Sequence, residues 1–155
     1  MNSNLKLLIP PPLVALAAGF LIWQTSKAAP QLLIHVPAQL GVAILVASVG
    51  LFIELTGVIQ FFSRRTTVNP LKPNTSSHLI TDGFYRFSRN PMYVGMMLLL
   101  LAWSVHLGAL ILGPCAIALA MWYLTIFQIK PEEEALETMF GKDYQTYKSQ
   151  VRRWI

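Results

Sequence analysis

Long runs of apolar residues, separated by polar connections, dominate the pattern of this chain. Four runs are long enough to cross a bilayer, whose hydrocarbon core of roughly 30 Å takes about 20 apolar residues per helix. They lie near residues 7–26, 36–62, 91–107 and 109–129. The pattern therefore predicts an all-α integral membrane protein, with four transmembrane helices in a single domain of residues 1–155.

Two features predict how these helices pack. Residues 104–108 alone join the third and fourth runs, which leaves room only for a tight antiparallel hairpin. The second run carries small residues at spacings that let neighbouring helices approach closely in lipid. These residues are Gly41, Ala43, Ala47, Gly50 and Gly57. We expect the second helix to lie inside the bundle.

The charged residues indicate how the chain is oriented. Only 12% of the residues are charged and 54% are hydrophobic, which is typical of a membrane protein rather than a soluble domain. Most Lys and Arg residues lie in the 63–90 loop and after residue 129, so the positive-inside rule places both termini and that loop in the cytoplasm. The expected location is a bacterial inner membrane. Anionic lipid headgroups account for the net charge of +5 without a nucleic-acid partner.

The residues that commonly bind metals are few and scattered. A single cysteine, Cys115, lies in the fourth run, and His35, His78 and His106 are far apart in the sequence. No disulfide can form within the chain, and no metal-ligand spacing occurs. The sequence therefore predicts no metal site, and we expect these four residues to be structural.

Polar chemistry is concentrated first in residues 83–95, GFYRFSRNPMYVG, directly before and within the third run. Asn90 before Pro91 is typical of a helix start, with Asn as the N-cap and Pro at the first helical position. That role requires neither Arg86 nor Arg89. These arginines and the neighbouring aromatic residues either anchor the chain in the headgroup region or form part of a binding site.

The second polar block follows the fourth run. Pro131 opens a predicted helix whose first turn holds Glu132, Glu133 and Glu134, where the helix dipole favours acidic residues. An apolar stripe continues at steps of three and four, and predicts a cytoplasmic amphipathic helix over 131–154 on the membrane surface, with a possible bend at Gly141. The stripe consists of Leu136, Phe140, Tyr144, Tyr147, Val151 and Trp154.

The hairpin brings the two polar blocks together. The third helix begins where the first block ends, and the fourth helix ends where the second block begins, so residues 83–95 and 130–154 should share one wall. Arginines would then face a cluster of carboxylates in a partly dry pocket. Such a pocket suits a zwitterionic or mixed-charge ligand.

The ordered set of motifs resembles the isoprenylcysteine carboxyl methyltransferase and phospholipid methyltransferase superfamily, over residues 63–155. It consists of Arg89-Asn90-Pro91-Met92-Tyr93 with Gly95, a hydrophobic hairpin, Pro131-Glu132-Glu133, and Phe140-Gly141 with Tyr144 and Tyr147. Residues 66–70 and 81–83 are similar to the preceding loop in small bacterial members. The resemblance implies a membrane enzyme that uses S-adenosylmethionine at the cytoplasmic side and takes a lipophilic acceptor from the bilayer.

The resemblance also implies a set of site residues. Arg89, Asn90, Pro91, Tyr93 and Gly95 match the family's Arg-His-Pro-x-Tyr-x-Gly element, and Glu132 and Glu133 match its paired glutamates. Asn90 stands where the better-studied prenylcysteine enzymes carry histidine. Since Asn does not titrate near neutrality, it cannot accept a proton as histidine does.

The chemistry of methyl transfer agrees with these residues, because it depends mainly on aligning the reactants and excluding water. Tyr85 or Tyr93 can hold a sulfonium by cation–π contact, and Arg86 or Arg89 can pair with the cofactor carboxylate. The glutamates can accept hydrogen bonds from ribose hydroxyls or the amino group. The individual roles, the acceptor atom (carboxylate, thiol, amine or hydroxyl) and the oligomeric state are left open by the sequence.

Glu54 is an acid in the middle of the second apolar run. An ionisable group within a membrane span is costly and marks a functional position by default, so Glu54 joins Arg89 and Asn90 as a candidate catalytic residue. The alternative is a structural glutamate that ties its helix to a neighbour through Thr56 or Gln60.

Two other functions remain to be separated from a methyltransferase. Sterol reductases of related fold carry a similar Arg-His-Pro-x-Tyr-x-Gly element and use NADPH, although four spans leave little room for a second nucleotide site. A non-catalytic membrane scaffold or lipid-binding module would use the arginines and glutamates only to anchor the hairpin. Binding of S-adenosylmethionine and of NADPH to the purified protein discriminates among the three.

Overall fold

The computed structural model describes residues 9–63 and 79–155, and every regular element within these ranges is helical. The predicted all-α class is therefore confirmed. The α-helices are α1 (Pro11–Ala28), α2 (Gln39–Ser63), α3 (Pro91–His106), α4 (Leu112–Leu124), α5 (Lys130–Phe140) and α6 (Lys142–Gln150). The shorter elements are two 3₁₀ turns, η2 (Pro30–Leu32) and η4 (Gly83–Arg86), and a π-helical turn, η5 (Thr125–Ile129).

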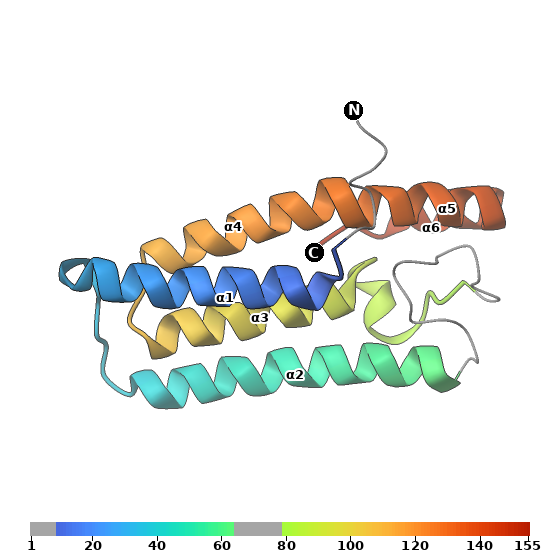
Figure 1. Cartoon of the computed structure of the whole chain (residues 1–155). Coiled ribbons are helices and arrows are strands. Elements are labelled where there is room, and N and C mark those ends of the chain that lie inside the picture. Colours follow the sequence, from blue (N-terminus) through green and yellow to red (C-terminus); the bar gives the residue numbers. More distant parts are fainter. Residues whose placement is uncertain (1–8, 64–78) are drawn as a thin grey trace.

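The long helices lie side by side and alternate in direction, with α3 between α2 and the pair formed by α1 and α4 (Figure 1). The main core joins three of them, through Ile22 of α1, Met96 and Leu100 of α3, and Ile117 and Leu124 of α4. The short connections lie at one end of the bundle. The start of α3 and the end of α4 lie at the other end, as the predicted hairpin requires.

Two helices are long and apolar enough to cross a membrane: Gln39–Gln60 within α2, and the continuous helix Leu112–Phe140 formed by α4, η5 and α5. Helix α3 is apolar but shorter. The helices start later than the apolar runs that predicted them, at residue 11 rather than 7 and at residue 112 rather than 109. The second delay arises because residues 107–111 form the turn, where Gly108 adopts a φ of +72°.

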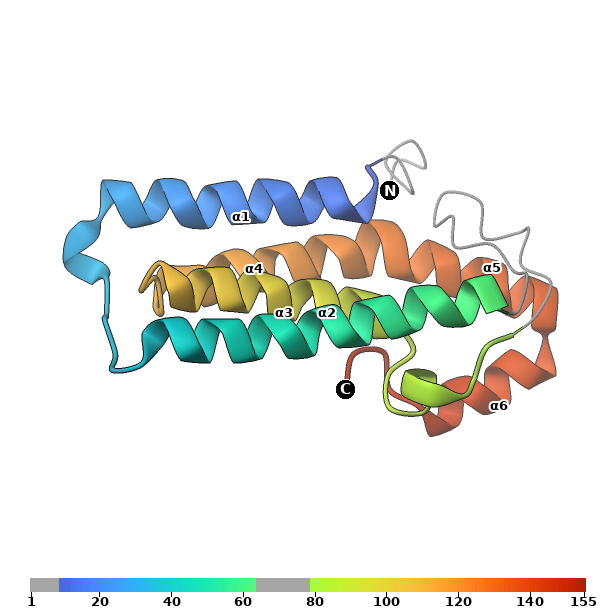
Figure 2. The same cartoon turned by 90° about the horizontal axis from the view of Figure 1, so that it is seen from below.

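The prediction that the second helix lies inside the bundle is wrong. Helix α2 lies at the edge and packs mainly on α3, as the view from below shows (Figure 2). Gly50 and Gly57 serve this one contact: a Cβ on Gly50 would lie 2.9 Å from the carbonyl oxygen of Gly95, and one on Gly57 would lie 2.7 Å from Met92. The remaining faces of α2 expose large apolar side chains, including Leu40, Ile44 and Leu51. Small residues therefore indicate one close helix neighbour, not burial on all sides.

The C-terminal block also differs from its prediction. Pro131 does not open a separate helix, because α5 continues directly from η5, with Ile129 in helical conformation. No helix N-terminus is present there, so the dipole does not explain the acidic residues. Gly141, at a φ of +50°, separates α5 from α6, and α6 ends at Gln150. Residues 151–155 are therefore not part of the predicted helix.

The predicted apolar stripe packs on protein rather than lying on the membrane surface as a single helix. Tyr144 and Tyr147 of α6 are buried against Ile80 and Tyr85, and Leu136 and Phe140 of α5 with Val151 flank this second cluster. Trp154 instead packs against the main core. Helix α6 therefore packs against the segment that contains η4, and this segment leads directly into α3.

Candidate active site

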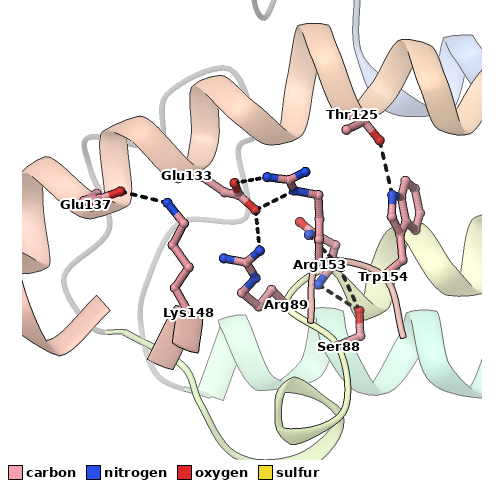
Figure 3. A network of polar contacts seen from close by, with 9 residues as sticks. Ser88, Arg89, Thr125, Glu133, Glu137, Lys148, Arg153 and Trp154 are labelled. Carbon is pink, nitrogen blue, oxygen red and sulfur yellow. Dashed lines mark hydrogen bonds and ion pairs between the residues drawn. The ribbon is translucent and has the colours of Figure 1, made fainter. Parts of the chain in front are cut away.

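An ionic cluster of Arg89, Glu133 and Arg153 lies where α3 begins and α5 follows the π-helical turn (Figure 3). Nη2 of Arg89 lies 3.1 Å from Oε1 of Glu133. Arg153 donates two parallel hydrogen bonds to the same carboxylate, from Nε to Oε1 at 2.9 Å and from Nη2 to Oε2 at 2.7 Å. The predicted meeting of the two polar blocks is confirmed for Arg89 and Glu133.

Burial makes this cluster more than a surface ion pair. The side chains of Arg89 and Glu133 are only 9% and 8% exposed. Two nitrogens of Arg89, Nε and Nη1, are buried and have no hydrogen-bond partner among the described residues. A buried donor without a partner is costly, and a guanidinium in this state is suited to bind a carboxylate or a similar oxyanion.

The tyrosines beside the cluster hold its backbone in place. The hydroxyl of Tyr147 donates a hydrogen bond of 2.8 Å to the backbone carbonyl of Tyr85, four residues before Arg89. Burial raises the pKa of Tyr144 to about 12, with a further contribution from the negative charge of Glu133. Burial also raises the pKa of Tyr147 and of Tyr85. These phenols are therefore protonated at neutral pH and do not act as bases.

Asn90 differs from the sequence-based interpretation as an N-cap. It occupies the residue before α3, but its side chain makes no capping hydrogen bond. Its Nδ2 instead donates to the backbone carbonyl of Arg153 at 2.9 Å, while Ser88 Oγ accepts from the Asn90 backbone N–H at 3.0 Å. The amide thus ties the start of α3 to residues near the C-terminus.

A second polar cluster surrounds Glu132. The hydroxyl of Tyr93 and Nε2 of Gln128 each donate a 2.7 Å hydrogen bond to Oε1 of Glu132. Both of these donors are uncharged, and no ion pair joins Glu132 to another residue in the described part of the chain. A partly buried carboxylate in this setting favours a cationic ligand group.

The remaining candidates lie in different surroundings. Arg86 is exposed on η4, away from the buried cluster. Pro91 is buried at the first position of α3, and Gly95 packs directly on α2. Glu54 is half-buried opposite Gly95, where a Cβ on the glycine would lie 2.9 Å from that of Glu54. Thr56, one suggested partner of Glu54, donates instead to the carbonyl of Phe52 within its own helix.

Sequence reasoning missed Arg153 and Gln128. Gln128 is 1% exposed and stands alone as an amide in the apolar run 109–129, which was the available signal. Arg153 had no comparable signal, because the pattern placed it on the polar face of a helix that the structure ends at Gln150.

An apolar groove is lined in part by Trp154, which directly follows Arg153 of the ionic cluster in the sequence. It runs between α3 and α4, has a volume of about 300 Å³ and is bounded by Trp154 and Ile155. Its walls include Val94, Met97 and Leu101 from α3, and Ile117 and Met121 from α4. The indole Nε1 of Trp154 donates to Thr125 Oγ1 at 3.2 Å, which holds the ring against η5. The groove fits an apolar chain.

Together, these observations describe an all-α protein that has two helices long and apolar enough to cross a membrane and a buried polar site at one end of the helices. Residues 38–143, more than half of the chain, match the model of the phospholipid methyltransferase family. The chain belongs to this family, and the superfamily predicted from the motifs is confirmed.

Individual relatives cover less of the chain. A protein-S-isoprenylcysteine O-methyltransferase of Schizosaccharomyces pombe is 28% identical over 102 residues, which are 66% of this chain and 43% of that protein. A protein of the same name from Dictyostelium discoideum is 34% identical over 76 residues, 47% of this chain and 30% of that protein. An uncharacterized Haemophilus influenzae protein is 41% identical over 64 residues, its full length and 41% of this chain. This chain thus matches less than half the length of these two methyltransferases. No solved structure is significantly similar to it.

Proposed function

We propose that the protein is an integral membrane, S-adenosylmethionine-dependent methyltransferase that acts on a small or lipid-like acceptor. The observation that carries the proposal is the pair of buried, unpartnered donors on Arg89, beside the carboxylates of Glu132 and Glu133. S-adenosylmethionine carries a carboxylate, an amino group and a sulfonium, so it needs both kinds of partner. The residues present fit this cofactor.

The two clusters would bind different parts of the cofactor. Nε and Nη1 of Arg89 are placed to bind the carboxylate. Glu132, which accepts hydrogen bonds from the neutral Tyr93 and Gln128, is placed to face a positive group. Glu133 is already shared by two guanidiniums, so its role is to position them rather than to accept from the ribose. Tyr93, whose hydroxyl bonds to Glu132, has an aromatic ring of the kind that can hold a sulfonium.

When bound, the cofactor supplies an electrophilic methyl group, and the chain needs no nucleophile of its own. The residues of the chain bind the cofactor and the acceptor, orient them, and exclude water. Candidate roles for Asn90 and Pro91 are then indirect: Asn90 fastens the start of α3 to the C-terminal residues, and Pro91 fixes where that helix begins. Arg86 and Tyr85 lie on η4, in the segment that leads into α3. The backbone carbonyl of Tyr85 accepts a hydrogen bond from Tyr147.

Membrane topology completes the proposal. Four spans with both termini and the 63–90 loop in the cytoplasm put both clusters at the cytoplasmic end of α3 and α4, in line with the distribution of Lys and Arg. The apolar groove lined by Val94 and Trp154 then receives the lipophilic part of the acceptor from the bilayer.

The direct test is to incubate the purified protein with methyl-labelled S-adenosylmethionine and a native lipid extract. We expect the label to move to an extractable acceptor, which mass spectrometry then identifies. The Arg89→Lys variant, which cannot present the same planar fork of donors, is the control. Binding of NADPH with no affinity for S-adenosylmethionine would favour the reductase, and affinity for neither cofactor would favour the scaffold.

Glu54 is open to a separate test. Its side chain makes no hydrogen bond or ion pair with another described residue, although an acid within an apolar helix is costly. We expect Glu54→Gln to lower turnover at least about a hundredfold, as for loss of an acid–base group, with unchanged cofactor affinity. Steady-state kinetics with the true acceptor measures both. Full turnover in this variant would leave Glu54 a structural residue.

A further inference from the structure

The last five residues of the chain, 151–155, form a C-terminal strap that runs beside the start of α3. The Arg89 backbone N–H donates to the carbonyl of Arg152 at 3.0 Å. The carbonyl of Arg153 accepts from Asn90 Nδ2 at 2.9 Å and from Ser88 Oγ at 3.4 Å. These contacts fix the main chain of Arg153 against that of Arg89, as Figure 3 shows for Ser88 and Arg153.

The side chain of Arg153 forms hydrogen bonds with both oxygens of the Glu133 carboxylate, to which Arg89 would otherwise form two bonds. Its fork engages both oxygens of Glu133, at 2.9 Å and 2.7 Å. A fork-to-fork pair of this kind is the strongest arrangement available to a carboxylate and a guanidinium. Arg89 reaches the same group with a single nitrogen, Nη2, at 3.1 Å.

As a consequence, two hydrogen-bond donors of Arg89 are left without a partner in the described part of the chain. Arg89 is buried nine-tenths, and its Nε and Nη1 have no partner among the described residues. Without Arg153, the simplest relief for these donors would be a two-bond pair between Arg89 and Glu133. The hydrogen bond from Arg153 to Glu133 also raises the pKa of the Arg153 guanidinium, so the competitor is charged at any physiological pH.

We propose that Arg153 is a positioning residue of this site: by taking both oxygens of Glu133, it keeps Nε and Nη1 of Arg89 available to an anionic ligand group. The identity of that group, the carboxylate of S-adenosylmethionine, rests on the proposed function. The division of Glu133 between the two arginines does not.

The test compares Arg153→Lys and Arg153→Gln with the wild-type full chain in detergent. Lysine keeps the charge but offers no planar fork, so it leaves a Glu133 oxygen to Arg89. We expect the Kd and KM for S-adenosylmethionine to rise about tenfold, equivalent to one charge-assisted hydrogen bond, with kcat within about twofold. Glutamine should weaken binding further. The melting temperature of the lysine variant should stay near that of the wild type.

Lys148→Gln is the matched control for the lost charge. Lys148 pairs with Glu137 at 3.0 Å, but the two side chains are 39% and 36% exposed, and the pair lies apart from Glu133. An exposed pair contributes little, so this variant should bind S-adenosylmethionine as the wild type does. An equal loss of affinity in Lys148→Gln would assign the effect to net charge and overturn the proposal.

A second readout separates this inference from the proposed function. In ¹⁵Nε–¹Hε spectra, with Arg89 assigned through Arg89→Lys, the Arg89 cross-peak should move in both Arg153 variants as its Nε–H gains a carboxylate partner. An unmoved cross-peak would overturn the inference even if the variants bind cofactor poorly. If the wild type takes up no S-adenosylmethionine, the proposed function fails, and the spectra still decide whether Arg153 holds Arg89 in this state.

Discussion

Replacing Glu133 by Gln should abolish measurable cofactor binding and destabilise the protein. Glutamine has the same shape but no charge, so Arg89, only 9% exposed, would lose the charged partner of its ion pair with Glu133. Removing one partner of a buried pair typically costs about 3–5 kcal/mol. Arg153, at 31% exposed, retains solvent and contributes less to this loss. We therefore expect a fall in affinity of at least about a hundredfold, on the order of 3 kcal/mol.

Glu134→Gln is the control for this result. Glu134 is the next residue, also acidic and also on α5, but exposed. Calorimetric titration with S-adenosylmethionine and thermal unfolding in the same detergent should give wild-type values for Glu134→Gln and large losses for Glu133→Gln. Wild-type affinity in Glu133→Gln would remove this carboxylate from the site.

The second large effect is expected at Gly95. A Cβ there would lie 2.7 Å from the carbonyl oxygen of Gly50 and 3.0 Å from the backbone nitrogen of Glu54. Backbone atoms cannot move aside as flexible side chains do, so α2 and α3 must separate. Gly95→Ala should lose at least about 2 kcal/mol of stability, in the upper part of the range for overpacked contacts. Thermal unfolding and the yield of folded protein measure the effect.

Two further alanine variants show whether packing is the cause. Gly50→Ala should behave like Gly95→Ala, because its Cβ would lie 2.9 Å from the Gly95 carbonyl, although Gly50 lies outside the motif. Gly41→Ala, with nothing within 4 Å of the added atom, should be nearly neutral. If Gly95→Ala lost cofactor affinity at full stability, the glycine would belong to the binding site rather than to the helix contact.

The sequence was sufficient to predict where Arg89 and Glu133 meet. The apolar runs indicate where α3 begins and where the apolar part of the last long helix ends, and a short hairpin brings these two points together. The positions of these two residues follow from the ends of the apolar runs, without knowledge of side-chain packing, although the helix that carries Glu133 continues to Phe140. For the same reason, the all-α class could be predicted before any contact was known.

The path of the last residues could not be predicted in the same way. Steps of three and four along 136–154 fit one amphipathic helix, but a buried cluster of Tyr85, Tyr144 and Tyr147 draws α6 onto the segment before α3 instead. The helix then ends at Gln150, and Arg153 enters the site. This outcome depends on tertiary contacts across more than 60 residues of sequence, which a local pattern does not contain.

The π-helical turn η5 sets the direction in which the acidic side chains after it point around the helix axis. A π-helical turn accommodates one more residue than an α-helical turn, and each residue of an α-helix advances the direction of its side chain by about 100°. The extra residue in Thr125–Ile129 therefore sets the azimuth of Glu132 and Glu133 relative to Leu124 and the rest of α4. In a strictly α-helical span of the same composition, both carboxylates would point about a quarter turn away from Tyr93 and Arg89.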